Sequence, residues 1–183
     1  MAKVIVGMTM SLDGFVSDRN GDISRLYPDL DQLRKAEFLQ EEIRATGADV
    51  MGRRAYDMGQ GDFTDYEFQV PIFVLTHAAP TEVTKGQNDR LTLTFVTDGI
   101  ESAINKAKAA AGDRDVMVIG SASTSQQCLK AGLADELSFG IVPILLGGGL
   151  RWFEDLGGMQ IELEKIKVYE SPGRIDIRYR VLK

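Results

Sequence analysis

One segment of the sequence places a glycine and two arginines directly after an apolar run, where a phosphate group could bind. In "ADVMGRRAYD" the run ends at Gly52, and Arg53 and Arg54 follow where a short helix is expected to begin. A glycine lets a ligand approach the backbone, a helix start offers free N–H groups, and an arginine can bind phosphate through two hydrogen bonds. The alternative is that both arginines are simply solvated.

A second segment, "VMVIGSASTSQQCLKAG", has the same arrangement without the basic residues. An apolar strand is expected to end at Gly120, and a helix then begins among small residues: Ser121, Ala122, Ser123 and Thr124. Backbone N–H groups that no bulky side chain covers could hold a diphosphate here. Small residues also cap helices where there is no ligand, so a purely structural reading stays open.

A third segment, "FVLTHAAP", ends an apolar run at Thr76 and His77. A lone histidine in this position is also typical of an ordinary surface residue. Each of the three segments is a weak signal by itself. Together they are informative, because the ligands of open α/β sheets bind outside the carboxyl ends of successive strands.

The stretch "MTMSLDGFVSDRNGD" follows the first apolar run and mixes apolar side chains with turn residues. Leu12, Phe15 and Val16 lie among Asp-Gly and Asn-Gly pairs. A loop with this composition is expected to be ordered rather than mobile, and ordered loops at strand ends often cover ligands.

The remaining pattern predicts an α/β fold with a largely parallel sheet and an antiparallel C-terminal edge, because helices and strands alternate first and strands then pair. A helix is expected to end at Gly47, before a short buried strand. Expected strands cover 3–10, 70–76, 91–96, 115–120, 135–148, 160–168 and 174–182, and expected helices cover 29–46, 100–111 and 123–131.

Length and composition predict one globular domain, residues 1–183, of ordinary apolar and charged content. A net charge of −6 argues against a nucleic-acid partner. No apolar run approaches the roughly 20 residues that span a bilayer, and the N-terminus has no signal-peptide pattern, so a cytoplasmic protein with no membrane partner is expected. One cysteine and one histidine do not supply the ligands of a typical zinc site, so no metal is expected.

Several other kinds of site are not indicated. The G-x-G-x-x-G pattern of an ordinary dinucleotide-binding domain does not follow the first strand. Gly147 to Gly149 are interpreted as a turn or bulge, and Cys128 as a core residue. The serines have no histidine arranged as in a hydrolase triad.

Taken together, "GMTMSLDGFVS", "VMGRRAYD", "IFVLT", "VIGSASTSQQCLKAGLADEL" and "IVPILLGGGLRWFEDL" resemble the dihydrofolate reductase-like superfamily over nearly the whole chain. The closer likeness is to the branch that contains the reductase domain of bacterial riboflavin biosynthesis. The resemblance implies a mostly parallel sheet with flanking helices and a C-terminal antiparallel hairpin. It also implies NADPH bound across the strand ends and hydride transfer to a C=N or C=O group.

The resemblance assigns cofactor residues by position. Gly52, Arg53 and Arg54 match the motif that binds NADPH phosphates, and Thr76 matches a strand end near the adenosine phosphate. His77 is the only basic side chain just beyond it, which leaves the choice between NADPH and NADH open. The glycine turn that holds the diphosphate is matched by Gly120, Ser121, Ala122, Ser123 and Thr124.

The same resemblance assigns the substrate side. The loop that covers nicotinamide and substrate is matched by Thr9, Met10, Asp13, Gly14, Phe15 and Val16. Asp29 and Asp31 fall near the acidic residue that holds the pteridine in folate reductases, although a helix start also favours carboxylates without a ligand. Asp13 and Asp31 are therefore the catalytic candidates, and Asp13, Phe15 and Asp29 the substrate-binding candidates.

These assignments predict an NADPH-dependent reductase of a small heterocycle of the pterin or pyrimidine type, similar to the 5-amino-6-(5-phosphoribosylamino)uracil reductase domain of riboflavin biosynthesis. Three alternatives stay open. One is a dihydrofolate reductase proper, the second is a non-catalytic homologue that keeps only the nucleotide cleft, and the third is a purely structural dimer built on the C-terminal strands. A homodimer is also expected from the resemblance, since members of this branch often pair through sheet edges.

Overall fold

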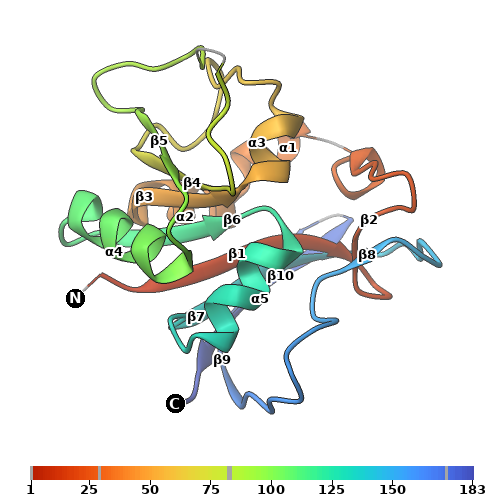
Figure 1. The fold of residues 1–183 in the computed structure, drawn as a ribbon. Coiled ribbons are helices and arrows are strands. Elements are labelled where there is room, and N and C mark those ends of the chain that lie inside the picture. The colour runs from red at the N-terminus through yellow and green to blue at the C-terminus, as the bar shows by residue number, and fades with distance from the viewer. Residues whose placement is uncertain (1, 29, 82–83, 172) are drawn as a thin grey trace.

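The computed structural model describes residues 2–28, 30–81, 84–171 and 173–183, which form one eight-stranded sheet with helices on both faces (Figure 1). The strand order is β5-β4-β3-β6-β1-β7-β10-β9. The sheet strands are β1 (Val4–Ser11), β3 (Thr46–Gly52), β4 (Ile72–Leu75), β5 (Leu93–Val96), β6 (Asp115–Ile119), β7 (Glu136–Val142), β9 (Leu163–Ser171) and β10 (Arg174–Val181). A separate two-stranded ribbon joins β2 (Phe15–Ser17) to β8 (Leu150–Arg151).

The first six strands in this order run parallel, and β10 and β9 then add as antiparallel strands. This arrangement confirms the predicted α/β class with an antiparallel C-terminal edge. The helices are α1 (Leu30–Lys35), α2 (Glu37–Ala45), α3 (Arg53–Met58), α4 (Ile100–Ala111) and α5 (Ala122–Lys130), with a 3₁₀ turn at Ser24–Leu26. Among the described helices, none is long and apolar enough to cross a membrane.

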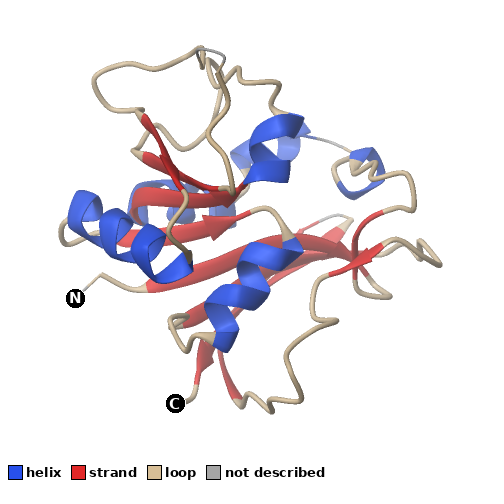
Figure 2. Cartoon of the chain, viewed as in Figure 1, coloured by secondary structure: helices blue, strands red, loops and turns tan. Residues whose placement is uncertain are grey.

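Helices α4 and α5 lie on one face of the sheet and α2 lies on the other (Figure 2). Strand residues alternate between the faces, so Val4, Val6 and Val50 point toward α4 and α5 and form the main apolar core with them. The face toward α2 instead carries polar side chains at buried positions, among them Asp49 and Ser138. This polar face becomes important for the site described below.

The prediction of one continuous helix over 29–46 is wrong. Ala36 adopts an extended conformation, with φ −64° and ψ 136°, and separates α1 from α2. The predicted helix end at Gly47 is also wrong, because α2 ends at Ala45 and Gly47 lies inside β3. A Cβ at Gly47 would lie 2.7 Å from the Ala111 carbonyl oxygen. The absence of a side chain at Gly47 therefore allows the end of α4 to approach β3 closely.

Candidate functional site

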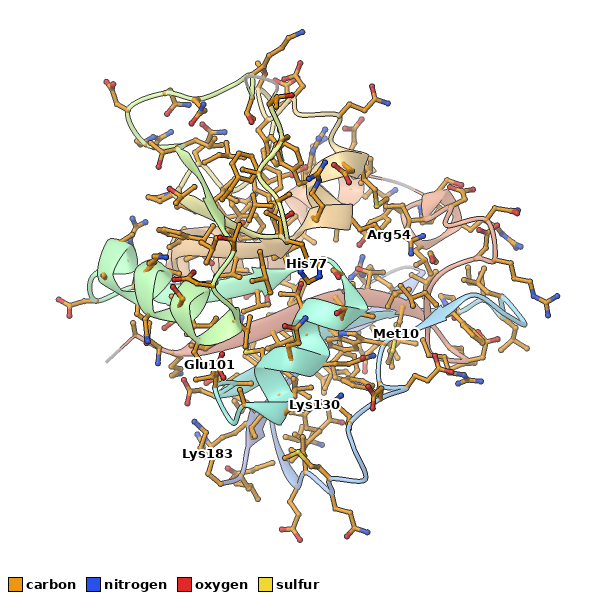
Figure 3. All side chains as sticks on the ribbon, viewed as in Figure 1. Met10, Arg54, His77, Glu101, Lys130 and Lys183 are labelled. Atoms are coloured by element: carbon orange, nitrogen blue, oxygen red, sulfur yellow. The ribbon has the colours of Figure 1, made fainter. Side chains whose placement is uncertain are left out.

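A cleft of about 480 Å³ opens at the carboxyl ends of β3 and β4, beside the start of α5. We call it the strand-end cleft. Its lining comes from all three segments that the sequence singled out: Gly52, Arg53, Arg54, Leu75, Thr76, His77, Ala78, Thr97, Gly99, Ser121, Ser123, Thr124 and Gln127. Figure 3 shows Arg54 and His77 on the same side of the molecule, close to α5. The structure thus brings most of the predicted cofactor residues together.

Two glycines allow the elements around this cleft to pack closely. A Cβ on Gly52 would lie 2.5 Å from Thr124 Oγ1 and 2.6 Å from Ser121 Cβ. Gly120 has φ +67°, and its Cβ would lie 2.6 Å from Ala55 Cβ. The end of β3 therefore contacts the start of α5, and the end of β6 contacts α3.

The start of α5 is an open set of N–H donors. The first backbone hydrogen bond of the helix is donated by Ser125 N to Ser121 O. The N–H groups before Ser125 therefore have no acceptor within the helix. Ser121 makes no side-chain capping bond within the described structure. Ser123 and Thr124 line the cleft, whereas Ala122 is buried and does not line it. Such a helix start is suited to an anionic group, because donors and the helix dipole both face it.

The two arginines are held in different ways. Arg53 donates from Nε to Asp57 at 2.7 Å and from Nη1 to the Ala78 carbonyl at 3.0 Å. Thr76 donates from Oγ1 to the same carbonyl at 2.9 Å, which fixes the chain after β4. Arg54 lies against the turn at Gly21, where an added Cβ would come 2.4 Å from its Nη2.

A second cavity, of about 220 Å³, lies on the opposite face of the sheet, against α1 and α2. We call it the inner cavity. Most of its wall is apolar or aromatic, with polar side chains from several elements among them. It is lined by Gly7, Met8, Thr9, Tyr27, Leu30, Leu33, Arg34, Phe38, Leu39, Glu42, Tyr66, Glu67, Phe68, Met117, Ile119, Gly120, Ser138 and Arg174.

The two spaces adjoin at one turn of the chain. Gly120 lines the inner cavity and the next residue, Ser121, lines the strand-end cleft. Both have positive φ, +67° and +69°. The turn after β6 therefore separates a site suited to an anionic group from a mainly apolar one suited to a flat ring.

The loop after β1 is ordered, and Asp13 holds it in place. Asp13 accepts hydrogen bonds from Ser11 Oγ at 2.6 Å, Leu146 N at 3.1 Å and Gly147 N at 2.8 Å. The Ser11 bond, with those two backbone bonds, lowers the pKa of the Asp13 carboxyl to about 2, although desolvation opposes the shift. Asp13 is thus an ionised group that joins two loops, which does not suit it to donate a proton near neutral pH.

The other loop candidates, Phe15, Thr9 and Met10, have different surroundings. Phe15 is buried in the β2–β8 ribbon, with the Arg151 guanidinium 4.5 Å from its ring centre. Thr9 lines the inner cavity and accepts a hydrogen bond from Arg174 Nη2 at 3.3 Å. Met10 packs against the main core.

Of the two acidic candidates at the first helix, Asp31 lines neither space. The side chain of Asp31 is 86% exposed and lies 3.8 Å from Arg34 Nη1, so the geometry does not support its predicted catalytic role. Asp29 lies outside the described residues, and its predicted role stays a prediction.

Two acids do line the inner cavity, Glu67, which is paired with Arg34, and the more deeply buried Glu42 of α2, and sequence reasoning missed both. The Glu42 carboxylate oxygen Oε1 accepts hydrogen bonds from Ser138 Oγ and from Arg178 Nη2, the latter at 3.1 Å. Burial raises the pKa of Glu42, and these two donors only partly offset the shift. The signal was its spacing, since Glu42 follows the apolar Phe38 by four residues and so shares its helix face.

A second buried acid lies nearby but does not line the cavity. Asp49 accepts a hydrogen bond from Tyr66 Oη at 2.8 Å, and its Oδ1 has no partner among the described residues. Burial raises the pKa of Asp49 to about 8, against the effect of the Tyr66 bond. Burial also raises the pKa of Tyr66, which lines the cavity.

The fold is that of an α/β domain with the topology of dihydrofolate reductases. Residues 2–175 match the model of the RibD C-terminal domain, and the chain belongs to that family. It is similar to an uncharacterized protein, YyaP, of Bacillus subtilis, with 27% identity over 185 residues that cover 97% of this chain and 94% of that protein.

Solved structures agree with this family and fold. A protein provisionally assigned to riboflavin biosynthesis from Shewanella sp. PV-4 is 28% identical, with all of both chains covered and a TM-score of 0.79. A dihydrofolate reductase from Enterococcus faecalis, complexed with NADP(H), is similar in fold, with a TM-score of 0.63 over 99% of this chain and 97% of that one at 14% identity.

Proposed function

We propose that the protein is an NADPH-dependent reductase that transfers hydride to a small nitrogen heterocycle of the pterin or pyrimidine type. The observation that carries this proposal is the meeting of the strand-end cleft and the inner cavity at Gly120 and Ser121. A reductase needs its two ligands side by side, and this turn has an anion-suited site on one side and an apolar one on the other. Membership of the RibD C-terminal family supports the same reaction class.

The residues of the cleft fit the phosphates of a dinucleotide. The N–H donors at the start of α5 suit the diphosphate, Arg53 and Arg54 supply local positive charge on a chain of net charge −6, and His77 adds a further polar side chain. When bound, a reduced nicotinamide supplies the hydride. A preference for NADPH over NADH would come from the two arginines.

The inner cavity would orient the acceptor and keep water away from it. Aromatic and aliphatic side chains, among them Phe38, Met117 and Tyr66, form walls suited to a flat ring. Thr9, Glu42 and Arg174 supply the few polar groups that can fix its orientation. Holding two reactants in such a geometry lowers the barrier to reaction without any covalent step on the protein.

One further candidate is a homologue that binds the nucleotide without catalysis. It is favoured by the placement of the predicted catalytic acids, since Asp31 faces solvent and Asp13 is engaged with Leu146 and Gly147. NADPH binding would be the same under both readings. Consumption of NADPH in the presence of a heterocyclic acceptor separates them.

The test is NADPH oxidation with a panel of pterin- and pyrimidine-type acceptors, measured for wild type, Arg54→Ala and Arg44→Ala. Arg44 lies in the last turn of α2, outside the cleft, and serves as the matched control. We expect Arg54→Ala to raise the KM for NADPH about tenfold, the loss of one charge-assisted phosphate contact, and to leave the KM of the acceptor unchanged. NADPH binding without oxidation by any acceptor would favour the non-catalytic homologue.

A further inference from the structure

An ion pair forms part of the wall of the inner cavity, between α1 and the segment before β4. Arg34 of α1 donates from Nε to Glu67 Oε1 at 2.8 Å, and both residues line the cavity. The side chain of Glu67 is 26% exposed and that of Arg34 is 46% exposed, so the pair lies where the cavity meets solvent. A substituent that extends from a bound ring on this side therefore meets the pair.

A further space, of about 550 Å³, lies beside α3 and shares Tyr66, Glu67 and Ile119 with the inner cavity. We call it the outer pocket. The inner cavity alone, at about 220 Å³, is smaller than the pockets that hold drug-sized ligands. The substituent of a larger acceptor would therefore extend into the outer pocket, past Glu67.

The outer pocket has a negative charge. Of its lining residues in the described part of the chain, three are acids, Asp62, Asp65 and Glu67, and none is a lysine or an arginine. An anionic substituent in this pocket would be repelled by these carboxylates. It could bind only if a cation at the edge of the pocket were free to pair with it.

Arg34 is the cation in that position, but carboxylates already surround it. The hydrogen bond and the charge of Glu67 raise the pKa of Arg34, and the charges of Asp31 and Asp65 add to the shift, while desolvation opposes it. Asp31 Oδ1 lies 3.8 Å from Arg34 Nη1. The positive charge of Arg34 is therefore balanced before any ligand binds.

The other cations nearby do not replace Arg34. Arg174 lines the inner cavity but is bound to the buried carboxylate of Asp176, with Nε 3.0 Å from Oδ1. Lys35 of α1 lines neither the inner cavity nor the outer pocket. Binding of an anionic substituent would thus depend on Arg34, and Glu67 decides whether Arg34 is available.

We propose that Glu67 selects the acceptor by charge: because it pairs with Arg34, the site takes rings that carry no anionic substituent. The proposal rests on the proposed function and narrows its substrate class. It favours an uncharged pterin or pyrimidine. It excludes acceptors with a carboxylate tail, as in dihydrofolate, or with a phosphate, as in 5-amino-6-(5-phosphoribosylamino)uracil.

The test compares pterin with pterin-6-carboxylate, which has the same ring and one added carboxylate. Binding of each is measured from ligand fluorescence at pH 6.5, where pterin is uncharged and the added carboxylate is ionised. We expect the wild type to bind pterin about fivefold more tightly, the effect of one partly exposed charge interaction. Glu67→Gln keeps the size of the side chain and removes its charge, so this preference should disappear.

Two further variants show whether the ion pair is responsible. Asp65→Asn is the matched control, because Asp65 lines the same pocket but acts on Arg34 through its charge alone. Its preference for pterin should stay close to that of the wild type. Adding Arg34→Ala to Glu67→Gln should restore the preference, since the guanidinium that the first substitution frees is then absent.

Four results would overturn the proposal. The first is equal or tighter binding of pterin-6-carboxylate to the wild type, which would mean that another cation, such as Lys35, receives the substituent. The others are an unchanged preference in Glu67→Gln, an equal change in Asp65→Asn, and failure of both pterins to bind the wild type. If Glu67→Gln does not fold, Glu67→Ala replaces it and is judged by the same results.

The cofactor gives an independent readout in the same samples. Neither Glu67 nor Arg34 lines the strand-end cleft, so NADPH should stabilise these variants as much as the wild type. Loss of NADPH binding in every protein would defeat the proposed function. The ratio of the two pterin affinities bears on Glu67 whether or not NADPH binds.

Discussion

Gly120 and Gly132 have nearly the same φ, +67° and +66°, but different surroundings. A Cβ at Gly120 would lie 2.6 Å from Ala55 Cβ, whereas a Cβ at Gly132 would meet nothing within 4 Å. Both substitutions by alanine carry the cost of positive φ, about 1–2 kcal/mol. Gly120→Ala should cost a further 1–3 kcal/mol or so from overpacking and should weaken NADPH binding.

Urea unfolding and NADPH titration of both variants check this prediction. Gly132→Ala controls for the backbone conformation and should bind NADPH as wild type does. Equal losses of stability and unchanged NADPH binding in both variants would mean that the turn after β6 does not shape the cleft.

Asp49 is expected to make the folded protein less stable as pH rises. Its pKa rises from 3.8 to about 8 on folding, so between these values the folded protein keeps a proton that the unfolded chain has lost. The free energy of unfolding should therefore fall as pH rises, by at most about 1.4 kcal/mol per pH unit from this group. The stability of Asp49→Asn relative to that of the wild type should therefore increase as pH rises from 5 to 8.

Urea unfolding at pH 5, 6, 7 and 8 measures the difference. Asp98→Asn is the control, because bonds from Ser102 lower the pKa of Asp98 and keep it ionised in both states over this range. A constant difference between Asp49→Asn and wild type at all four pH values would show that Asp49 titrates normally.

At the scale of elements, Asp13 joins the turn after β1 to the loop before β8. We expect Asp13→Ala to speed hydrogen exchange at the Leu146 and Gly147 amides, which donate to it. In wild type this protection should be complete above pH 3.8 and decline as pH falls toward 2, because folding lowers the pKa of Asp13 to about 2.

The control for this prediction is Asp18→Ala. Asp18 accepts from Asn20 N and Asp22 N within its own turn, so its loss should leave Leu146 and Gly147 protected. Exchange at those two amides that does not change in Asp13→Ala would show that the carboxylate does not hold the loops together.

The elements with strong local patterns could be predicted from sequence. The helix at Ile100–Ala111 and the segment from Gly120 into α5 were predicted because apolar periodicity and glycines at the ends of elements are local signals. The break at Ala36 could not be found in this way, since alanine favours helix and no glycine or proline marks the position.

The same difference between local and long-range signals explains which residues of the site could be predicted. The strand-end cleft was predicted because glycines and helix starts are visible in sequence, while Glu42 was missed because a polar residue in a helix normally faces solvent. Its burial depends on Ser138 and Arg178, which lie 96 and 136 residues away along the chain. Such long-range pairs leave no local pattern.

At the scale of the whole molecule, self-association stays a prediction. β9 is an edge strand of the sheet, and its Leu163, Ile166 and Val168 are exposed. An exposed apolar edge is a template for pairing with a second copy. We expect sedimentation velocity to show a dimer that Val168→Lys shifts to monomer, whereas Met58→Lys on α3 has no effect. A wild-type monomer at all concentrations would contradict this.

Binding of NADPH in the strand-end cleft can be measured by a thermal-shift titration of the purified protein with NADPH and, separately, with NADH. A ligand that binds only the folded state, at about 100 times its Kd, adds roughly 2.7 kcal/mol to stability. We expect a clear rise in Tm with NADPH and a smaller one with NADH. No rise with either nucleotide would contradict it, because the helix start of α5 and the basic residues around it would then not form a nucleotide site.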